Sequence, residues 1–145
     1  MPIAVLYLLA KMKFIPDIYA SDRRSRTLPF LAAVAGYGVG SVLLVLTDAP
    51  PLISALMLCY AVNTAVMTLI TLVWKISIHA SGVAGPAVAF GSAFGLAGYL
   101  FLLLVIPVGW SRLALKAHSV SQVAAGALIA IVLTYYELGV YLPVL

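Results

Sequence analysis

From residue 27 onward the chain is a series of apolar stretches of similar length, separated by short polar segments or prolines. Over the whole chain 65% of residues are hydrophobic and 8% are charged, against roughly 45–50% and 25% in soluble domains. At about 1.5 Å per residue, an apolar helix needs about 20 residues to cross the roughly 30 Å hydrocarbon core of a bilayer. The stretches therefore predict an all-α, polytopic membrane helical bundle, with residues 1–145 forming a single integral-membrane domain.

Prolines and polar residues divide this chain into five expected spans and a partial N-terminal helix. Pro29 suits a first helical turn, and Asp48-Ala-Pro-Pro51 suits a tight turn between two helices. The first ten residues cover only half a bilayer and precede Lys11 rather than follow it, which fits neither a full span nor a signal peptide. We therefore expect either that this segment lies partly embedded in the membrane or, as the favoured alternative, that the natural start lies further upstream and the segment is part of a longer helix. The spans are expected at residues 28–47, at 52–74, after the polar stretch 75–81 up to about 93, from 96 to about 110, and from the polar stretch 111–122 to about 136.

The few charges are unevenly distributed. Eight cations and four acidic residues are too few for a coiled coil, a disordered chain or a nucleic-acid-binding protein, so we expect no nucleic-acid partner. The cations form three patches with two expected spans between consecutive patches, and an even number of crossings returns the chain to the same side. All cations, with His79 and His118, are thus expected at one membrane face, and Asp48 and Glu137 near the other. The patches are Lys11, Lys13, Arg23, Arg24 and Arg26, then Lys75, then Arg112 and Lys116.

The orientation of this basic face follows from the excess of lysine and arginine in cytoplasmic loops of membrane proteins. It predicts a multi-pass protein of the cell membrane with the basic face in the cytoplasm. Most of the other cations are candidates for the functional site described below, so only Lys11 and Lys13 bear on orientation independently. The same rule does not predict the two histidines.

Both histidines lie in compact polar clusters, at residues 75–82 and 111–122. Ionisable groups at membrane depth are costly and by default mark a functional site. Arginine, lysine, serine and helix N-terminal N–H groups are what neutralise and bind a phosphate. Two histidines without a nearby carboxylate or thiolate are a poor ligand set for a metal, and Cys59 is the single cysteine. We expect an anion site with no metal and no cofactor.

Small residues four positions apart suggest close helix packing. In lipid, such pairs let helix backbones approach, whereas leucine packing gains nothing over contact with lipid. They are candidate faces for packing within the chain or between copies in a homo-oligomer. The pairs are Gly36 with Gly40 and Gly91 with Gly95.

The second polar cluster carries the more specific motif. Ser111-Arg112, five residues and then His118 resemble the third signature of the type 2 phosphatidic acid phosphatase superfamily, S-R-x5-H-x3-D. Where that family has the aspartate, this chain has Gln122, one helical turn after His118. A glutamine carbonyl can accept the imidazole N–H and fix its tautomer, but it cannot stabilise a developing positive charge.

The first cluster is similar to a second signature of the family. Ile76-Ser77-Ile78-His79 keeps the serine and histidine of P-S-G-H at the same spacing. The first signature, K-x6-R-P, has its nearest counterpart at residues 22–29, a basic segment that ends in proline and lacks the lysine. The resemblance covers residues 22–126.

The resemblance implies a six-helix membrane fold and metal-independent hydrolysis of a lipid phosphate or diphosphate, of isoprenoid or glycerolipid type, through a phosphohistidine. It implies His118 as nucleophile, His79 as general acid and Gln122 in the place of the aspartate. An imidazole can serve in both roles near neutral pH. The alternative is a catalytically weak or inactive member that binds anionic lipids or serves as an assembly subunit. The residues that would bind the phosphate are Arg112, Ser77, Lys75, Arg26, Arg23 and Ser111.

Overall fold

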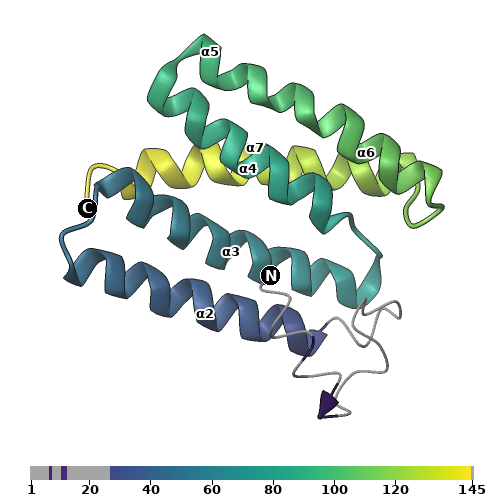
Figure 1. Cartoon of the computed structure of the whole chain (residues 1–145), viewed down its shortest axis with the longest axis horizontal. Coiled ribbons are helices and arrows are strands. Elements are labelled where there is room, and N and C mark those ends of the chain that lie inside the picture. Colours follow the sequence, from purple (N-terminus) through teal and green to yellow (C-terminus); the bar gives the residue numbers. More distant parts are fainter. Residues whose placement is uncertain (1–6, 8–10, 13–26, 145) are drawn as a thin grey trace.

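A computed structural model describes residues 7, 11, 12 and 27–144, and the regular structure in this part of the chain is entirely helical. Four of its helical segments are long and apolar enough to cross a membrane, namely Thr27–Leu46, Pro51–Val73, Leu96–Ala114 and Val120–Tyr141. These features confirm the all-α class and indicate a multi-pass membrane protein. In chain order (Figure 1) the elements are α2 (Thr27–Leu46), α3 (Pro51–Val73), α4 (Ile78–Phe94), α5 (Leu96–Tyr99), the 3-10 helix η2 (Leu100–Leu104), α6 (Val105–Ala114) and α7 (Val120–Tyr141).

The first two expected spans and the turn between them are confirmed. α2 ends at Leu46 and α3 begins at Pro51, with a proline in its first turn. Asp48 has a φ of 53°, the left-handed conformation that reverses the chain between them. The expected partial N-terminal helix lies almost entirely outside the described residues.

Later helix ends differ from those expected. α4 begins at Ile78, inside the expected polar stretch, because the Ser77 hydroxyl accepts the N–H of Ala80 at 3.4 Å and caps the helix. α6 continues to Ala114, past the expected end near residue 110, and α7 continues to Tyr141 rather than 136. The expected helix ends were placed where the apolar residues end, whereas the actual ends depend on capping groups and packing.

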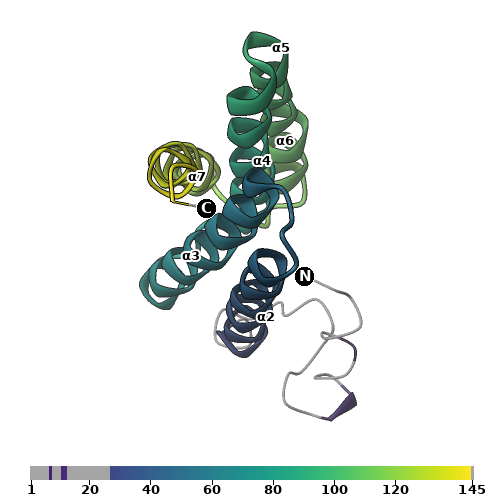
Figure 2. The same cartoon turned by 90° about the vertical axis from the view of Figure 1, so that its left-hand side faces the viewer.

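With 17 residues, α4 is shorter than the other long helices and rises by about 26 Å. It packs against α7, against the α5–η2 segment and, less extensively, against α3 (Figure 1). α2 packs substantially only against α3, among the elements described (Figure 2). The predicted number of five spans therefore depends on whether α4 crosses the bilayer, and it stays a prediction.

The interior is built from small side chains and the surface from large ones. Ala80, Ala84 and Ala130 are almost fully buried in the core between α4 and α7, while Leu96 and Val73 are 81% and 79% exposed. This distribution suits a bundle surrounded by lipid, where close backbone approach favours association and large apolar side chains face outward.

The glycine pairs have separate roles. Gly91 is buried, and a Cβ there would overlap the Tyr99 ring, so it allows α4 and α5 to pack closely. Gly95 provides the positive φ of 63° at the joint between these helices. A Cβ at Gly40 would meet the Met57 side chain of α3 at 3.5 Å, an ordinary contact, while Gly36 has open space around it. The predicted close packing is thus confirmed within the chain at Gly91, and association between copies stays a prediction.

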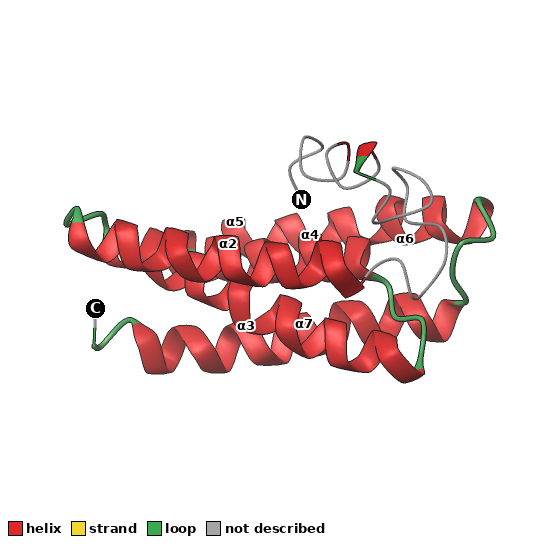
Figure 3. Cartoon of the chain, turned by 90° about the horizontal axis from the view of Figure 1, so that it is seen from below, coloured by secondary structure: helices red, strands yellow, loops and turns green. Residues whose placement is uncertain are grey.

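The two ends of the bundle differ in character. The start of α2, the α3–α4 linker and the α6–α7 loop lie at one end, and the α2–α3 turn, the α4–α5 joint and the C-terminus at the other (Figures 1 and 3). The basic residues that the structure describes at the first end, below called the basic end, gather as predicted, with Asp48 at the opposite end. Glu137 lies towards that opposite end, but it is only 5% exposed inside the bundle rather than at its surface. The residues gathered at the basic end are Lys75, His79, Arg112, Lys116 and His118.

Candidate active site

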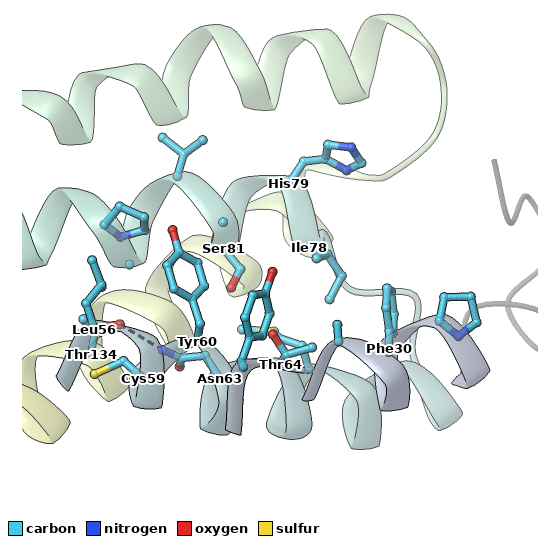
Figure 4. Close-up of a pocket in the computed structure, with 18 of the residues that line it drawn as sticks. Phe30, Leu56, Cys59, Tyr60, Asn63, Thr64, Ile78, His79, Ser81 and Thr134 are labelled. Carbon is cyan, nitrogen blue, oxygen red and sulfur yellow. Dashed lines mark hydrogen bonds between the residues drawn. The ribbon is translucent and has the colours of Figure 1, made fainter. Parts of the chain in front are cut away.

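A cavity of about 940 Å³ runs from the basic end into the bundle. Its walls come from α2, α3 and α4, with contributions from Arg112, the α6–α7 loop and Thr134 of α7. Figure 4 shows Phe30 and His79 towards one end of this cavity and Leu56, Cys59 and Thr134 towards the other. Such a volume lies at the upper end of the range typical of small-molecule sites.

Four of the nine predicted site residues line this cavity. They come from the α3–α4 linker, α4, α6 and the α6–α7 loop, so the fold brings together segments that are far apart in the sequence. The cavity lining includes no acidic side chain among the described residues, and its two cations favour an anionic group. The four residues are Lys75, His79, Arg112 and His118.

His118 is half-buried and its ring is oriented by the backbone. Its Nδ1 lies 3.1 Å from the carbonyl oxygen of Lys75. A carbonyl only accepts hydrogen bonds, so Nδ1 carries the proton, and in the neutral ring the lone pair lies on Nε2. The loop that carries His118 folds back on α6, because the N–H groups of Ala117 and His118 both donate to the carbonyl of Arg112, at 3.0 and 3.4 Å.

Ser111 contacts Arg112 rather than the cavity. The Ser111 hydroxyl donates to the carbonyl of Val108 at 2.8 Å and accepts from the Nε of Arg112 at 3.2 Å. Arg112 thereby has one edge of its guanidinium fixed while its side chain lines the cavity. The predicted phosphate-binding role of Arg112 is compatible with this geometry, and Ser111 is placed to orient it.

Ser77 is fully buried and is not among the residues that line the cavity. Its hydroxyl caps α4, and its N–H donates to the carbonyl of Gln122 at 3.2 Å. The structure thus places Ser77 at the junction of α4 and α7, where its hydroxyl is used by the backbone. Ser81, one turn further along α4, lines the cavity instead.

The Gln122 side chain takes part in helix capping. Its Oε1 accepts the N–H of Ser119 at 3.1 Å, and the Ser119 hydroxyl accepts the N–H of Gln122 at 3.3 Å. These two bonds form a capping box at the start of α7. The Gln122 side chain was expected to accept the imidazole N–H of His118, but the group that lies within hydrogen-bond distance of Nδ1 is the Lys75 carbonyl. The predicted Arg23 and Arg26 lie outside the described residues.

Several polar residues deep in the cavity were missed from the sequence. Tyr37 of α2 and Tyr60 of α3 both line it, and their rings pack against each other with centroids 5.3 Å apart. Further in, Asn63 donates to the Thr134 hydroxyl at 2.9 Å (Figure 4) and to the Glu137 carboxylate at 3.4 Å. The rule that singled out the histidines, that polar groups inside membrane helices are unusual, also applies to Asn63 and Glu137.

No family model matches this chain, and no curated protein or solved structure matches it. The family resemblance therefore depends on the two motifs and on the cavity that His79, Arg112 and His118 line.

Proposed function

We propose that this chain is an integral-membrane, metal-independent phosphatase that hydrolyses a lipid phosphate or diphosphate, as the resemblance to type 2 phosphatidic acid phosphatases implies. The observation that carries the proposal is the convergence of His79, His118, Arg112 and Lys75 on one cavity at the basic end of the bundle. Lys75 and His118 are 43 positions apart in the sequence. The fold thus brings both histidines of the two motifs to the lining of the same cavity.

In the first half of the reaction, Nε2 of His118 forms a bond to phosphorus while the bond from phosphorus to the lipid oxygen breaks. The protonated His79 gives its proton to that oxygen, so the lipid leaves as an alcohol or, from a diphosphate, as a monophosphate. The proton on Nδ1 stays in its hydrogen bond with the Lys75 carbonyl. His118 is then a phosphohistidine and His79 is neutral.

In the second half, water attacks phosphorus and the phosphorus–nitrogen bond breaks. Neutral His79 takes a proton from the water, inorganic phosphate leaves, and both histidines return to their starting states. Arg112 and Lys75 stabilise the negative charge on the phosphoryl oxygens in both halves. The lipid chain lies inside the cavity, against its apolar walls between α2 and α4.

Phosphate release from a panel of lipid phosphates by detergent-purified protein in EDTA tests this proposal. Wild type is expected to release phosphate, and His118→Ala is expected to lose at least about a hundredfold of that rate, the low end of the range for nucleophile and acid–base contributions. Tyr136→Phe, an exposed change on α7 outside the cavity, is the matched control. Equal rates of phosphate release by wild type and His118→Ala would refute the proposed phosphatase activity.

The alternative, a weak or inactive member that binds anionic lipids, is favoured by one observation, the amide of Gln122 where the family has a carboxylate. It predicts binding of vesicles that contain a lipid phosphate without phosphate release. Binding that is unchanged in Arg112→Ala would argue against both proposals, because Arg112 is one of the two half-buried cations that line the cavity among the described residues.

We also propose that the protein lies in the cell membrane with the basic end in the cytoplasm. Cysteines placed singly at Asp48 and at Lys13, with Cys59→Ser to remove the buried thiol, would report the two sides. An impermeant thiol reagent applied to intact cells is expected to label position 48 and not position 13. The reverse labelling would place the site on the outer face.

A further inference from the structure

We infer that the carbonyl of Lys75, in the α3–α4 linker, orients the His118 ring as the aspartate of the resembling family would do. We further infer that Gly126 is a positioning residue, because it lets the linker lie close to α7. The inference rests on the proposed function, since it names what orients the proposed nucleophile. It concerns a backbone group, so no motif in the sequence could indicate it.

The first step is the contact itself. The Lys75 carbonyl oxygen lies 3.1 Å from Nδ1 of His118, within ordinary hydrogen-bond distance. Among nearby acceptors, the Gln122 side chain is already engaged with the N–H of Ser119. Because a carbonyl only accepts, this contact favours the tautomer with the proton on Nδ1 and the lone pair on Nε2.

The second step is that the linker is held in place. Ile76 is completely buried in the core formed by α3, α4 and α7. On one side of it the N–H of Trp74 donates to the carbonyl of Ile70 at 2.8 Å, and on the other the N–H of Ser77 donates to the carbonyl of Gln122 at 3.2 Å. The Lys75 carbonyl is thus fixed between α3 and the first turn of α7.

The third step is the close approach at Gly126. A Cβ at this position would overlap the carbonyl oxygen of Ser77, and it would lie 3.2 Å from the Ser77 carbonyl carbon. Both neighbours are backbone atoms, so they cannot move aside by a change of rotamer. A side chain at Gly126 would push the linker away from α7, and Lys75 would move with it.

The chemical consequence differs from that of a carboxylate. A neutral carbonyl selects the tautomer, but it adds no negative charge to stabilise the imidazolium that forms on attack. In a serine protease, the wrong tautomer with its lost charge lowers turnover by about 10⁴. Here the carbonyl retains the tautomer, so the part of that loss that comes from the wrong tautomer is expected to be avoided.

The test compares Gly126→Ala with Gly139→Ala, a change on the same helix whose Cβ meets nothing within 4 Å. Phosphate release should show kcat lowered at least about tenfold in Gly126→Ala with KM within about twofold, and both constants unchanged in Gly139→Ala. Nitrogen-15 NMR of the histidine rings should show Nδ1 of His118 protonated in wild type at a pH where the ring is neutral. In Gly126→Ala the two tautomers should mix, with His118 signals identified by their loss in His118→Ala.

The wild-type spectrum decides the inference even if Gly126→Ala does not fold. A neutral His118 protonated on Nε2 in the wild type overturns it, and so does a Gly126→Ala protein with wild-type kcat. Absence of phosphate release from every lipid by wild type would instead refute the proposed function, while the tautomer of His118 would still report whether the Lys75 carbonyl holds the ring.

Discussion

Replacing Asn63 with leucine is expected to destabilise the bundle, whereas replacing its partner Glu137 is not. Asn63 is 8% exposed and its amide donates to both Thr134 and Glu137. Leucine is close to asparagine in shape, so the change removes both donated bonds without opening a large cavity. It leaves the carboxylate of Glu137 without its amide donor inside the bundle.

The magnitude follows from the two bonds. Hydrogen bonds between membrane helices contribute about 0.6 kcal/mol on average and up to about 1.7. The bond to Thr134, at 2.9 Å, is well formed, while the bond to Glu137, at 3.4 Å, is long. The change also removes Oδ1 of Asn63, a buried oxygen with no hydrogen-bond partner among the described residues, so loss of both bonds should cost about 1 kcal/mol. Glu137→Leu removes one long bond together with Oε1, which likewise has no partner in the described part of the chain, so its net effect should lie within about 0.5 kcal/mol of zero.

Unfolding in mixed detergent micelles with increasing SDS, followed by circular dichroism, measures these changes. The double variant should be no less stable than Asn63→Leu alone, because no unpaired carboxylate remains, and the coupling energy should be about 0.5–1 kcal/mol. The exposed change Tyr136→Phe serves as the neutral control. A loss of more than about 2 kcal/mol in Glu137→Leu, with Asn63→Leu unchanged, would refute the reasoning, since it would mean that the carboxylate itself holds the helices together.

Two further predictions concern the ends and joints of helices. Gln122→Ala should lower the free energy of unfolding by about 1 kcal/mol through loss of the capping box, while kcat/KM falls less than tenfold. Thermal unfolding and phosphate release measure these two effects. A far larger loss of kcat/KM would support the catalytic role of Gln122 expected from the sequence. Gly91→Ala should cost about 1–3 kcal/mol, because its Cβ overlaps an aromatic ring of α5. Gly36→Ala, in open space inside α2, should leave the free energy of unfolding unchanged or raise it by up to about 1 kcal/mol, because alanine favours a helix over glycine, and the reverse order of these two variants would contradict the packing described.

The sequence predicted those features that depend on local composition. Hydropathy and prolines located α2 and α3 to within one residue at each end. Counting expected crossings correctly placed Lys75 and His118 at one end, because parity depends on the number of helices and not on how they pack. The motif spacing predicted that His79 and Arg112 belong to one site, and both line the cavity.

What the sequence could not predict depends on contacts between distant segments. The Lys75 carbonyl has no sequence signature, so the motif pointed to Gln122 as the acceptor for His118. Asn63 and Glu137 are 74 positions apart, and their pairing depends on how α3 crosses α7. Ser77 matched a motif serine, yet its hydroxyl caps a helix, because the N–H groups at the start of α4 need an acceptor in a buried setting.

The single packing partner of α2 has a consequence for the size of molecule that the cavity admits. Phe30 and Tyr37 form part of the cavity wall, and among the described elements α2 packs substantially only against α3. The distance between this wall and α4 thus depends on one helix pair, joined at the turn around Asp48. A tilt of α2 about that turn would widen the cavity without breaking the packing of α4 on α7. We therefore expect changes at the α2–α3 contact to alter the girth of ligand that the cavity admits, while leaving the proposed catalytic residues in place.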